Sequence, residues 1–175
     1  MSNAPIPPHV DPRKLADRGA TLQGELLLAS LPRLCEPLVA TDGVVRAKLE
    51  FDREERRTAV IRSELDVEVK MICQRCLEPA TFTLHSEYSY LVVKEGQGDQ
   101  IVPQGYDALE VGEEPLDLLT LIEDELLLAL PIVPVHDPEE CQKPAGLDEP
   151  EEEQVEEARP NPFSVLAQLK RDPNV

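Results

Sequence analysis

The chain has 175 residues, a formal net charge of -18 and only 3% aromatic residues, with no Trp. This length suits one globular domain with tails, and its core must be built from aliphatic side chains. The charge is uneven, because residues 1–70 carry 11 basic and 12 acidic side chains, whereas residues 71–175 carry 6 basic and 23 acidic ones. Such a surface repels phosphate backbones and attracts basic partners, although acidity also keeps a protein soluble without any binding role.

Nothing in the sequence predicts targeting to a membrane. Residues 1–12 lack the apolar run of a signal peptide. The most apolar stretch, Leu116 to Val135, is interrupted by acidic residues and prolines, which excludes a membrane span. We therefore expect a cytoplasmic protein, in which the four cysteines are thiols or metal ligands rather than disulfides.

The first half of the chain predicts a short helix and two strands. After a flexible leader over residues 1–10, an aspartate that can act as N-cap and a following proline predict a helix over residues 11–16. The run from Thr21 to Leu31 is typical of a strand that a proline ends. Residues Val44 to Phe51 alternate between apolar and charged, which predicts a half-buried strand.

The middle of the chain predicts a long β-hairpin. Thr58 to Ile72 and Ala80 to Val93 both show the period of two that marks strands, and they would pair antiparallel. The Cys73–Cys76 turn then lies at the tip of the hairpin. Residues 95–112 are rich in glycine and acidic residues and predict irregular structure.

Leu116 to Leu130 is the clearest helical segment. Asp117 is a plausible N-cap, and Pro131 ends the helix. The apolar face is predicted to consist of Leu119, Ile122, Leu126, Ala129 and Leu130. Glu123 and Asp124 would lie on the solvent side. The pattern indicates a helix that packs on the sheet.

These elements predict one α+β domain over residues 11–145, with a mainly antiparallel sheet, open or curled toward a barrel, and one packed helix. Residues 148–157 contain seven acidic and no basic side chains, which predicts a disordered linker over residues 146–159. Residues 160–175 form a short amphipathic segment, whose helix would be marginal alone and should form on docking. Its contact residues would be Asn161, Pro162, Phe163, Leu166 and Leu169.

Four residues predict a metal site. Cys73 and Cys76 have the spacing with which a tight turn offers two thiolates to one ion, and His136 and Cys141 follow the main helix. Together they make a Cys3His set, a common ligand set of structural zinc. Zinc would fasten the segment after the helix to the hairpin. The alternative is a group of reduced thiols packed near a turn.

The sequence offers little for catalysis. There are three histidines, and no Gly-rich phosphate loop, serine nucleophile elbow or His-Glu-x-x-His motif. A zinc ion with four protein ligands has no open position for substrate. A redox cysteine needs a helix N-terminus or a similar activating group, whereas this pair joins two predicted strands. We expect a protein that is not an enzyme; a zinc hydrolase or redox protein is the less favoured alternative.

A basic stretch offers a different kind of site, for a partner protein or RNA. The candidates are Arg53, Arg56, Arg57 and Arg75. Acidic residues such as Glu54 and Glu55 alternate with them, which is also typical of a mixed-charge solvated face, and no aromatic platform for bases is evident.

The motifs taken together resemble the YceD family of bacterial proteins, named for large-subunit ribosomal RNA accumulation. They are Cys73-Gln-Arg-Cys76, the helix that ends in Leu126-Leu-Leu-Ala-Leu-Pro131, Pro134-Val-His136 with Cys141, and Asn161-Pro-Phe163 to Lys170. The resemblance covers nearly the whole chain. It implies a non-enzymatic role in the accumulation or maturation of large-subunit ribosomal RNA, hence in ribosome biogenesis, but supplies no mechanism.

The charge asymmetry suggests a mechanism. We hypothesise that the acidic domain holds a basic ribosomal protein or an intermediate of large-subunit assembly, with the C-terminal segment as a second contact. The alternative is a module that binds ribosomal RNA directly through the Arg53–Arg57 turn. Neither hypothesis requires a small-molecule substrate or a membrane.

Overall fold

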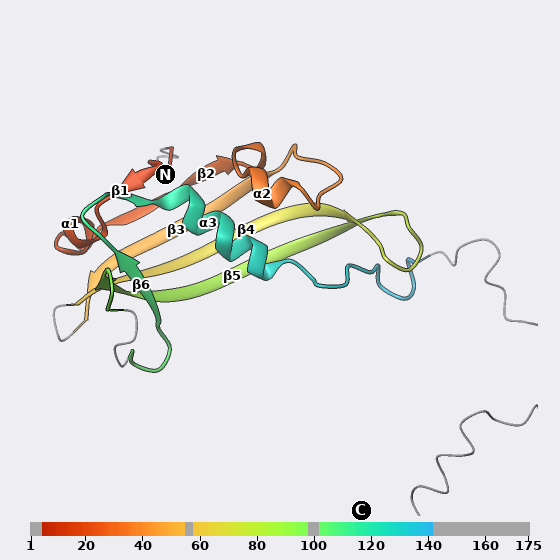
Figure 1. Ribbon diagram of the computed structural model, residues 1–175. Coiled ribbons are helices and arrows are strands. Elements are labelled where there is room, and N and C mark those ends of the chain that lie inside the picture. Colours follow the sequence, from red (N-terminus) through yellow and green to blue (C-terminus); the bar gives the residue numbers. More distant parts are fainter. Residues whose placement is uncertain (1–4, 55–57, 98–101, 142–175) are drawn as a thin grey trace, which may run out of the picture. The chain divides into compact units, whose positions relative to one another are not determined.

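The computed structural model describes residues 5–54, 58–97 and 102–141 (Figure 1). They belong to the first of two compact units, Met1–Gln142, and the second unit is Lys143–Val175. The predicted linker and C-terminal docking segment therefore lie outside the described residues, as do Arg56 and Arg57. Within the described part, no helix is both long and apolar enough to cross a membrane.

A five-stranded sheet with the order β2-β3-β4-β5-β6 forms the centre of the fold. Its strands are β2 Thr21–Leu27, β3 Val44–Arg53, β4 Ala59–Ile72, β5 Pro79–Lys94 and β6 Asp107–Val111. Strands β2 to β5 pair antiparallel, and β6 joins β5 in parallel. The sheet is not closed into a barrel, which corrects the barrel-like option of the prediction.

Strands β4 and β5 form a long hairpin that extends well beyond the rest of the sheet (Figure 1). Their register runs from Val60 opposite Leu91 to Ile72 opposite Pro79. The alternation of apolar and polar side chains places Leu65, Val67 and Val69 in the core, with the residues between them on the other face. The hairpin therefore carries its turn away from the main body of the sheet.

One face of the sheet is covered by helices. They are α1 Pro12–Ala16, α2 Pro32–Cys35, the 3₁₀ turn η1 Leu28–Ser30 and the longer α3 Leu118–Ala129. Helix α3 lies across the sheet (Figure 1), and its buried Leu118, Ile122 and Leu126 pack in one cluster with Leu49 and Ile61. The core is aliphatic apart from Phe51, as the composition predicted.

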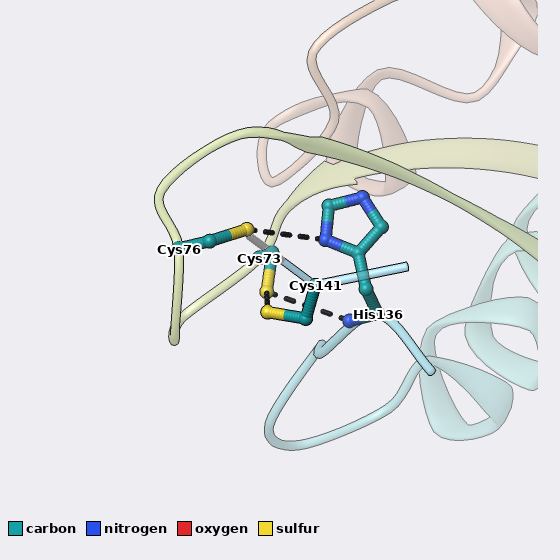
Figure 2. A group of neighbouring side chains, drawn as sticks. All are labelled: Cys73, Cys76, His136 and Cys141. Atoms are coloured by element: carbon teal, nitrogen blue, oxygen red, sulfur yellow. Dashed lines mark hydrogen bonds between the residues drawn. The ribbon is translucent and has the colours of Figure 1, made fainter. Parts of the chain in front are cut away.

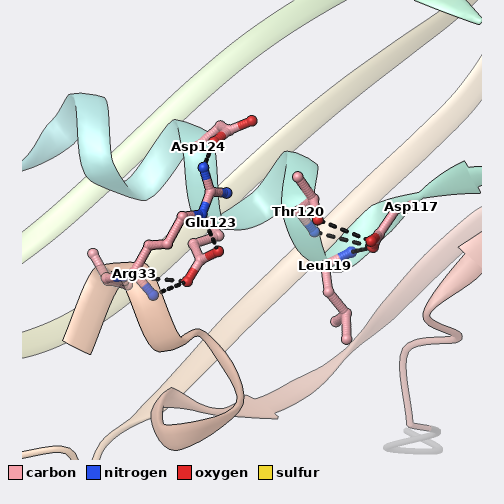
Figure 3. A network of polar contacts seen from close by, with 7 residues as sticks. Arg33, Asp117, Leu119, Thr120, Glu123 and Asp124 are labelled. Carbon is pink, nitrogen blue, oxygen red and sulfur yellow. Dashed lines mark hydrogen bonds and ion pairs between the residues drawn. The ribbon is translucent and has the colours of Figure 1, made fainter. Parts of the chain in front are cut away.

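Several predicted boundaries differ from the observed ones. The end of the predicted leader is ordered, because β1 His9–Val10 pairs with β7 Leu116–Asp117. The segment predicted to be irregular contains β6, and the predicted strand to Leu31 ends at Leu27. Asp117 caps α3 as expected, since its carboxylate accepts the N–H groups of Leu119 and Thr120 (Figure 3).

The orientation of α3 also differs from the prediction. Glu123, predicted to face solvent, is only 4% exposed, whereas Asp124 is exposed as predicted. The carboxylate of Glu123 accepts backbone N–H groups in the first turn of α2, as Figure 3 shows. Leu118 and Leu121, outside the predicted face, are buried as well, whereas Leu119 and Leu130 of that face are only partly buried against the core. The reason is that leucines occur on several sides of this helix, so their pattern does not select one face.

Candidate metal centre

The first half of the site is the tip of the β4–β5 hairpin. The N–H of Leu77 donates to the carbonyl of Cys73 at 2.9 Å, and the N–H of Cys73 donates to the carbonyl of Glu78 at 2.9 Å. These bonds close a tight turn that places the side chains of Cys73 and Cys76 on the same side (Figure 2). The turn requires a left-handed backbone at Leu77, with φ of 64°, a conformation that non-glycine residues rarely adopt.

The second half of the site is the segment that follows α3. After Pro131 the chain passes the hairpin tip, where the N–H of Gln74 donates to the carbonyl of Pro134 at 2.8 Å. A turn then brings Cys141 back, since its N–H donates to the carbonyl of Asp137 at 3.1 Å. These backbone contacts join two segments about sixty positions apart in the chain, as seen in the separation of Cys76 and His136.

The four residues that the sequence singled out meet at this place (Figure 2). One ligand atom from each of Cys73, Cys76, His136 and Cys141 lies within 4.8 Å of the other three. The sulfurs of Cys73 and Cys141 are 3.9 Å apart. Two thiolates at about 2.3 Å from a tetrahedral zinc would be about 3.8 Å apart. The donor set and its spacing therefore fit a zinc ion.

The ring of His136 is oriented so that Nδ1 is available as a metal ligand. Its Nε2 lies 3.0 Å from the carbonyl oxygen of Pro79, and a carbonyl only accepts, so Nε2 is the donor. In the neutral ring Nδ1 then carries the lone pair, and this atom lies 3.2 Å from the sulfur of Cys76. A metal-binding histidine is commonly held by a hydrogen bond from its other nitrogen to a carbonyl.

The surroundings stabilise thiolates. Burial raises the pKa of Cys73, but the backbone N–H groups of Cys76, His136 and Arg75 more than offset it, so that the pKa falls to about 5. The N–H of Glu78 lowers the pKa of Cys76, yet burial and the thiols of Cys73 and Cys141 leave it raised. Cys73 thus ionises easily while the adjacent Cys76 resists a second negative charge, and a bound cation would neutralise both thiolates.

Arg75 supports the cluster from outside. Its Nε donates to the sulfur of Cys141 at 2.8 Å, and a terminal nitrogen donates to the carbonyl of His136 at 3.1 Å. The hydrogen bond with Cys141 raises the pKa of Arg75. The sequence reasoning assigned Arg75 to a partner-binding surface and missed this contact. The position of Arg75 between Cys73 and Cys76 could have indicated that its side chain lies beside the thiols.

The cluster is partly buried, with His136 and Cys141 half-buried. Cys73 and Cys76 are buried and pack with Ala80, Phe82 and Cys141 in a small core of their own. A metal held by all four residues would have no open position for water or substrate. The arrangement is therefore suited to holding two segments together rather than to catalysis.

The other predicted site residues are not brought to this centre. Arg53 donates to the carboxylate of Asp17, with a closest distance of 2.6 Å. Arg56 and Arg57 lie outside the described residues, as do the C-terminal candidates Asn161, Pro162, Phe163, Leu166 and Leu169.

A family model and a curated protein that match this chain carry the same description. A family model described as Large ribosomal RNA subunit accumulation protein YceD matches residues 61–170. A protein of Haemophilus influenzae with the same name is 35% identical over 179 residues, which cover 98% of this chain and 99% of that protein. No solved structure matches the chain. The range matched by the family model contains both halves of the cysteine–histidine cluster and helix α3.

Proposed function

This chain belongs to the YceD family, and from that premise we propose that it acts in ribosome biogenesis, as a non-enzymatic factor for the accumulation of large-subunit ribosomal RNA. The observation that carries the proposal is the similarity to the named relative over almost the full length of both chains. The closed ligand geometry of the cysteine–histidine cluster is in keeping with a role that involves no reaction.

For the mechanism, we propose that the protein binds a basic ribosomal protein or an assembly intermediate that contains one. The support is the excess of acidic side chains beyond residue 70. Acidic side chains in this excess would attract Lys- and Arg-rich segments and keep them from binding nucleic acid elsewhere.

The alternative, direct binding of ribosomal RNA through the Arg53–Arg57 turn, has less support. Several basic side chains on β3 and β4 are engaged by acidic neighbours. Lys48 lies 2.8 Å from Glu50, and Arg62 lies 3.3 Å from Glu54. Such pairs reduce the positive field available to phosphates.

Crosslinking in cells tests the partner, and ribosomal RNA levels test the role. In a strain that lacks this protein, restoring the full chain should restore the ratio of large-subunit to small-subunit ribosomal RNA. Crosslinking of the restored protein should recover basic ribosomal proteins. Recovery of RNA alone, lost on Arg53→Glu, would favour the direct RNA-binding alternative. An unchanged RNA ratio with and without the protein would contradict the role itself.

We also propose that the cluster of Cys73, Cys76, His136 and Cys141 holds a structural zinc ion. The support is the Cys3His donor set, the sulfur spacing and the orientation of the imidazole. Bound zinc would fasten the segment after α3 to the hairpin tip. Elemental analysis of the purified protein tests it: about one zinc per chain is expected, and protein that is fully folded and metal-free would contradict the proposal.

A further inference from the structure

A groove runs along one edge of the hairpin, between β5 and the segment that follows α3. It has a volume of about 550 Å³, and its walls include Phe82 and Leu84 on one side and Ala129, Pro131 and Val135 on the other. Figure 1 shows the segment after α3 running alongside the hairpin toward its tip, where β5 begins. The groove adjoins the cysteine–histidine cluster, because His136 is one of its lining residues.

One wall of the groove is an open strand edge. Strand β5 pairs with β4 over nearly its whole length, but β6 pairs with it only from Tyr90 to Lys94. Among the described residues, no strand lies on the outer edge of Pro79–Ser89. In an antiparallel pair every second residue of an edge strand directs its N–H and C=O away from the sheet. Such an edge is a template for another strand.

The segment that forms the other wall is rich in exposed apolar side chains, of which Val135 lines the groove itself. Near the end of α3, Leu128 is 81% exposed and Ile132 is 95% exposed, and both Val133 and Val135 are exposed as well. Single exposed apolar residues are ordinary, but four within eight positions, one of them on the groove wall, are typical of a surface that binds a partner.

The charge around the groove selects the kind of partner. Asp137 and Glu140 line it, and Glu139 is exposed beside them. Neither Pro79–Val93 nor residues 112–141 contain a single Lys or Arg. The side chain of Arg75, at the hairpin tip, is bonded to Cys141 and His136. Lys70 of β4 lies opposite Thr81 of the groove wall, but the acidic side chains outnumber it. The net field at the groove is therefore negative, which disfavours a phosphate backbone and favours a cationic segment.

We propose that this groove binds an extended basic segment of a partner protein, which adds as a strand to the open edge of β5. Alternate side chains of the added strand would face the apolar wall, and the basic ones between them would meet Asp137 and Glu140. This inference rests on the proposed binding of a basic protein and deepens it, because it assigns the contact surface and the conformation of the bound segment.

The proposal is tested on the full chain with a synthetic peptide in which Lys and Val alternate over the length of Pro79–Ser89. Fluorescence anisotropy of the labelled peptide measures affinity. The double variant Asp137→Lys with Glu140→Lys should weaken binding by about tenfold or more. The matched control, Glu25→Lys with Glu64→Lys, makes the same charge change on β2 and β4, at positions that do not line the groove, and should stay within about twofold. Equal losses in both variants would overturn the proposal.

Two further measurements use the unchanged protein, so their outcome does not depend on whether a variant folds. A peptide with alternate backbone nitrogens methylated cannot complete the strand pairing and should lose most of its affinity; unchanged affinity would rule out strand addition. Hydrogen exchange should show protection of amides within Pro79–Ser89 when the unmodified peptide binds, and protection confined to other strands would overturn the site. An RNA oligonucleotide that competes for the same edge would also overturn it.

A failure of the groove proposal can be distinguished from a failure of the proposed function. The peptide assays report on the groove alone, whereas the ribosomal RNA ratio in the restored strain reports on the biological role. Failure of peptide binding with a restored ratio would reject the groove and leave the role intact. Binding that depends on the groove in a strain with an unchanged ratio would reject the role.

Discussion

The carboxylate of Glu123 accepts the backbone N–H of Arg33 at 2.7 Å, and its second oxygen accepts Nε of the same residue at 2.8 Å (Figure 3). The first oxygen also accepts the N–H of Leu34 at 3.1 Å. A buried acidic residue of α3 thus satisfies the free donors at the start of α2, which has no capping side chain of its own. This contact joins the two helices that cover the sheet.

Replacement of Glu123 should therefore be costly. Glu123→Ala leaves the part-buried N–H of Arg33 and the buried N–H of Leu34 without this acceptor, and we expect it to lower the free energy of unfolding by about 2–3 kcal/mol. The control is Asp124→Ala, which removes the exposed partner of the same arginine and should have little effect. Urea unfolding followed by circular dichroism measures both. Equal losses in the two variants would contradict the capping role of Glu123.

Loss of one ligand should separate the hairpin tip from the segment after α3. With zinc bound, Cys76→Ser should remove the metal from the purified protein and lower the unfolding temperature. Cys35→Ser is the matched control, because the sulfur of Cys35 lies 3.2 Å from the carbonyl of Leu28, outside the cluster. A chelator should reproduce the effect of Cys76→Ser in the parent protein and have no effect on that variant. Full zinc content in Cys76→Ser would exclude this residue as a ligand.

The left-handed backbone at Leu77 predicts a stabilising substitution. Leu77 is 70% exposed, so its side chain adds little burial, and its positive φ costs about 1 kcal/mol relative to glycine. Leu77→Gly should therefore raise the free energy of unfolding by up to about 1 kcal/mol.

The matched control for Leu77 is Gln74→Gly in the same turn. Gln74 is exposed and has no positive φ, so glycine there only adds freedom to the unfolded chain. The control should lower the free energy of unfolding by about 0.5–1 kcal/mol. A lower unfolding free energy in Leu77→Gly would show that the exposed leucine makes contacts that outweigh the backbone strain.

Glu125 predicts a dependence of stability on pH. Burial raises its pKa, the hydroxyl of Tyr90 donates to it and lowers the pKa in part, and the charges of Asp107 and Asp124 raise it again. The folded-state pKa is thus above the unfolded value of 4.5. The contribution of this group is fully present below the unfolded pKa and is lost as the pH rises through the folded pKa.

Glu125→Gln should remove that loss. Its unfolding free energy should match that of the parent protein near pH 4 and exceed it at pH 7, because the buried negative charge is absent. Tyr90→Phe should extend the loss to higher pH, since it removes the hydrogen bond that lowers the pKa of Glu125. Denaturant unfolding across this range measures both variants. A parent protein that gains stability relative to Glu125→Gln as the pH rises would reverse the assigned sign.

Much of the sheet could be predicted from local patterns. The alternation in Val44–Phe51 and in the two arms of the hairpin predicted β3, β4 and β5 to within about two residues, because a half-buried strand imposes a period of two on its own sequence. Strand β6 was missed. It is short, and it is defined by parallel pairing with β5. That pairing produces no alternation of apolar and polar residues in the sequence of β6 that could have predicted the strand.

The sequence by itself determined the strands of the hairpin, the aliphatic core and which three cysteines and one histidine form the cluster, because these depend on residue type and short-range spacing. Only the tertiary structure decided which face of the leucine-rich α3 is buried, why an acidic residue such as Glu123 belongs there, and that Arg75 supports Cys141. The open edge of β5 beside an acidic, apolar-walled groove is likewise a tertiary property. Each depends on segments far apart in the chain, whose mutual contacts no local pattern records.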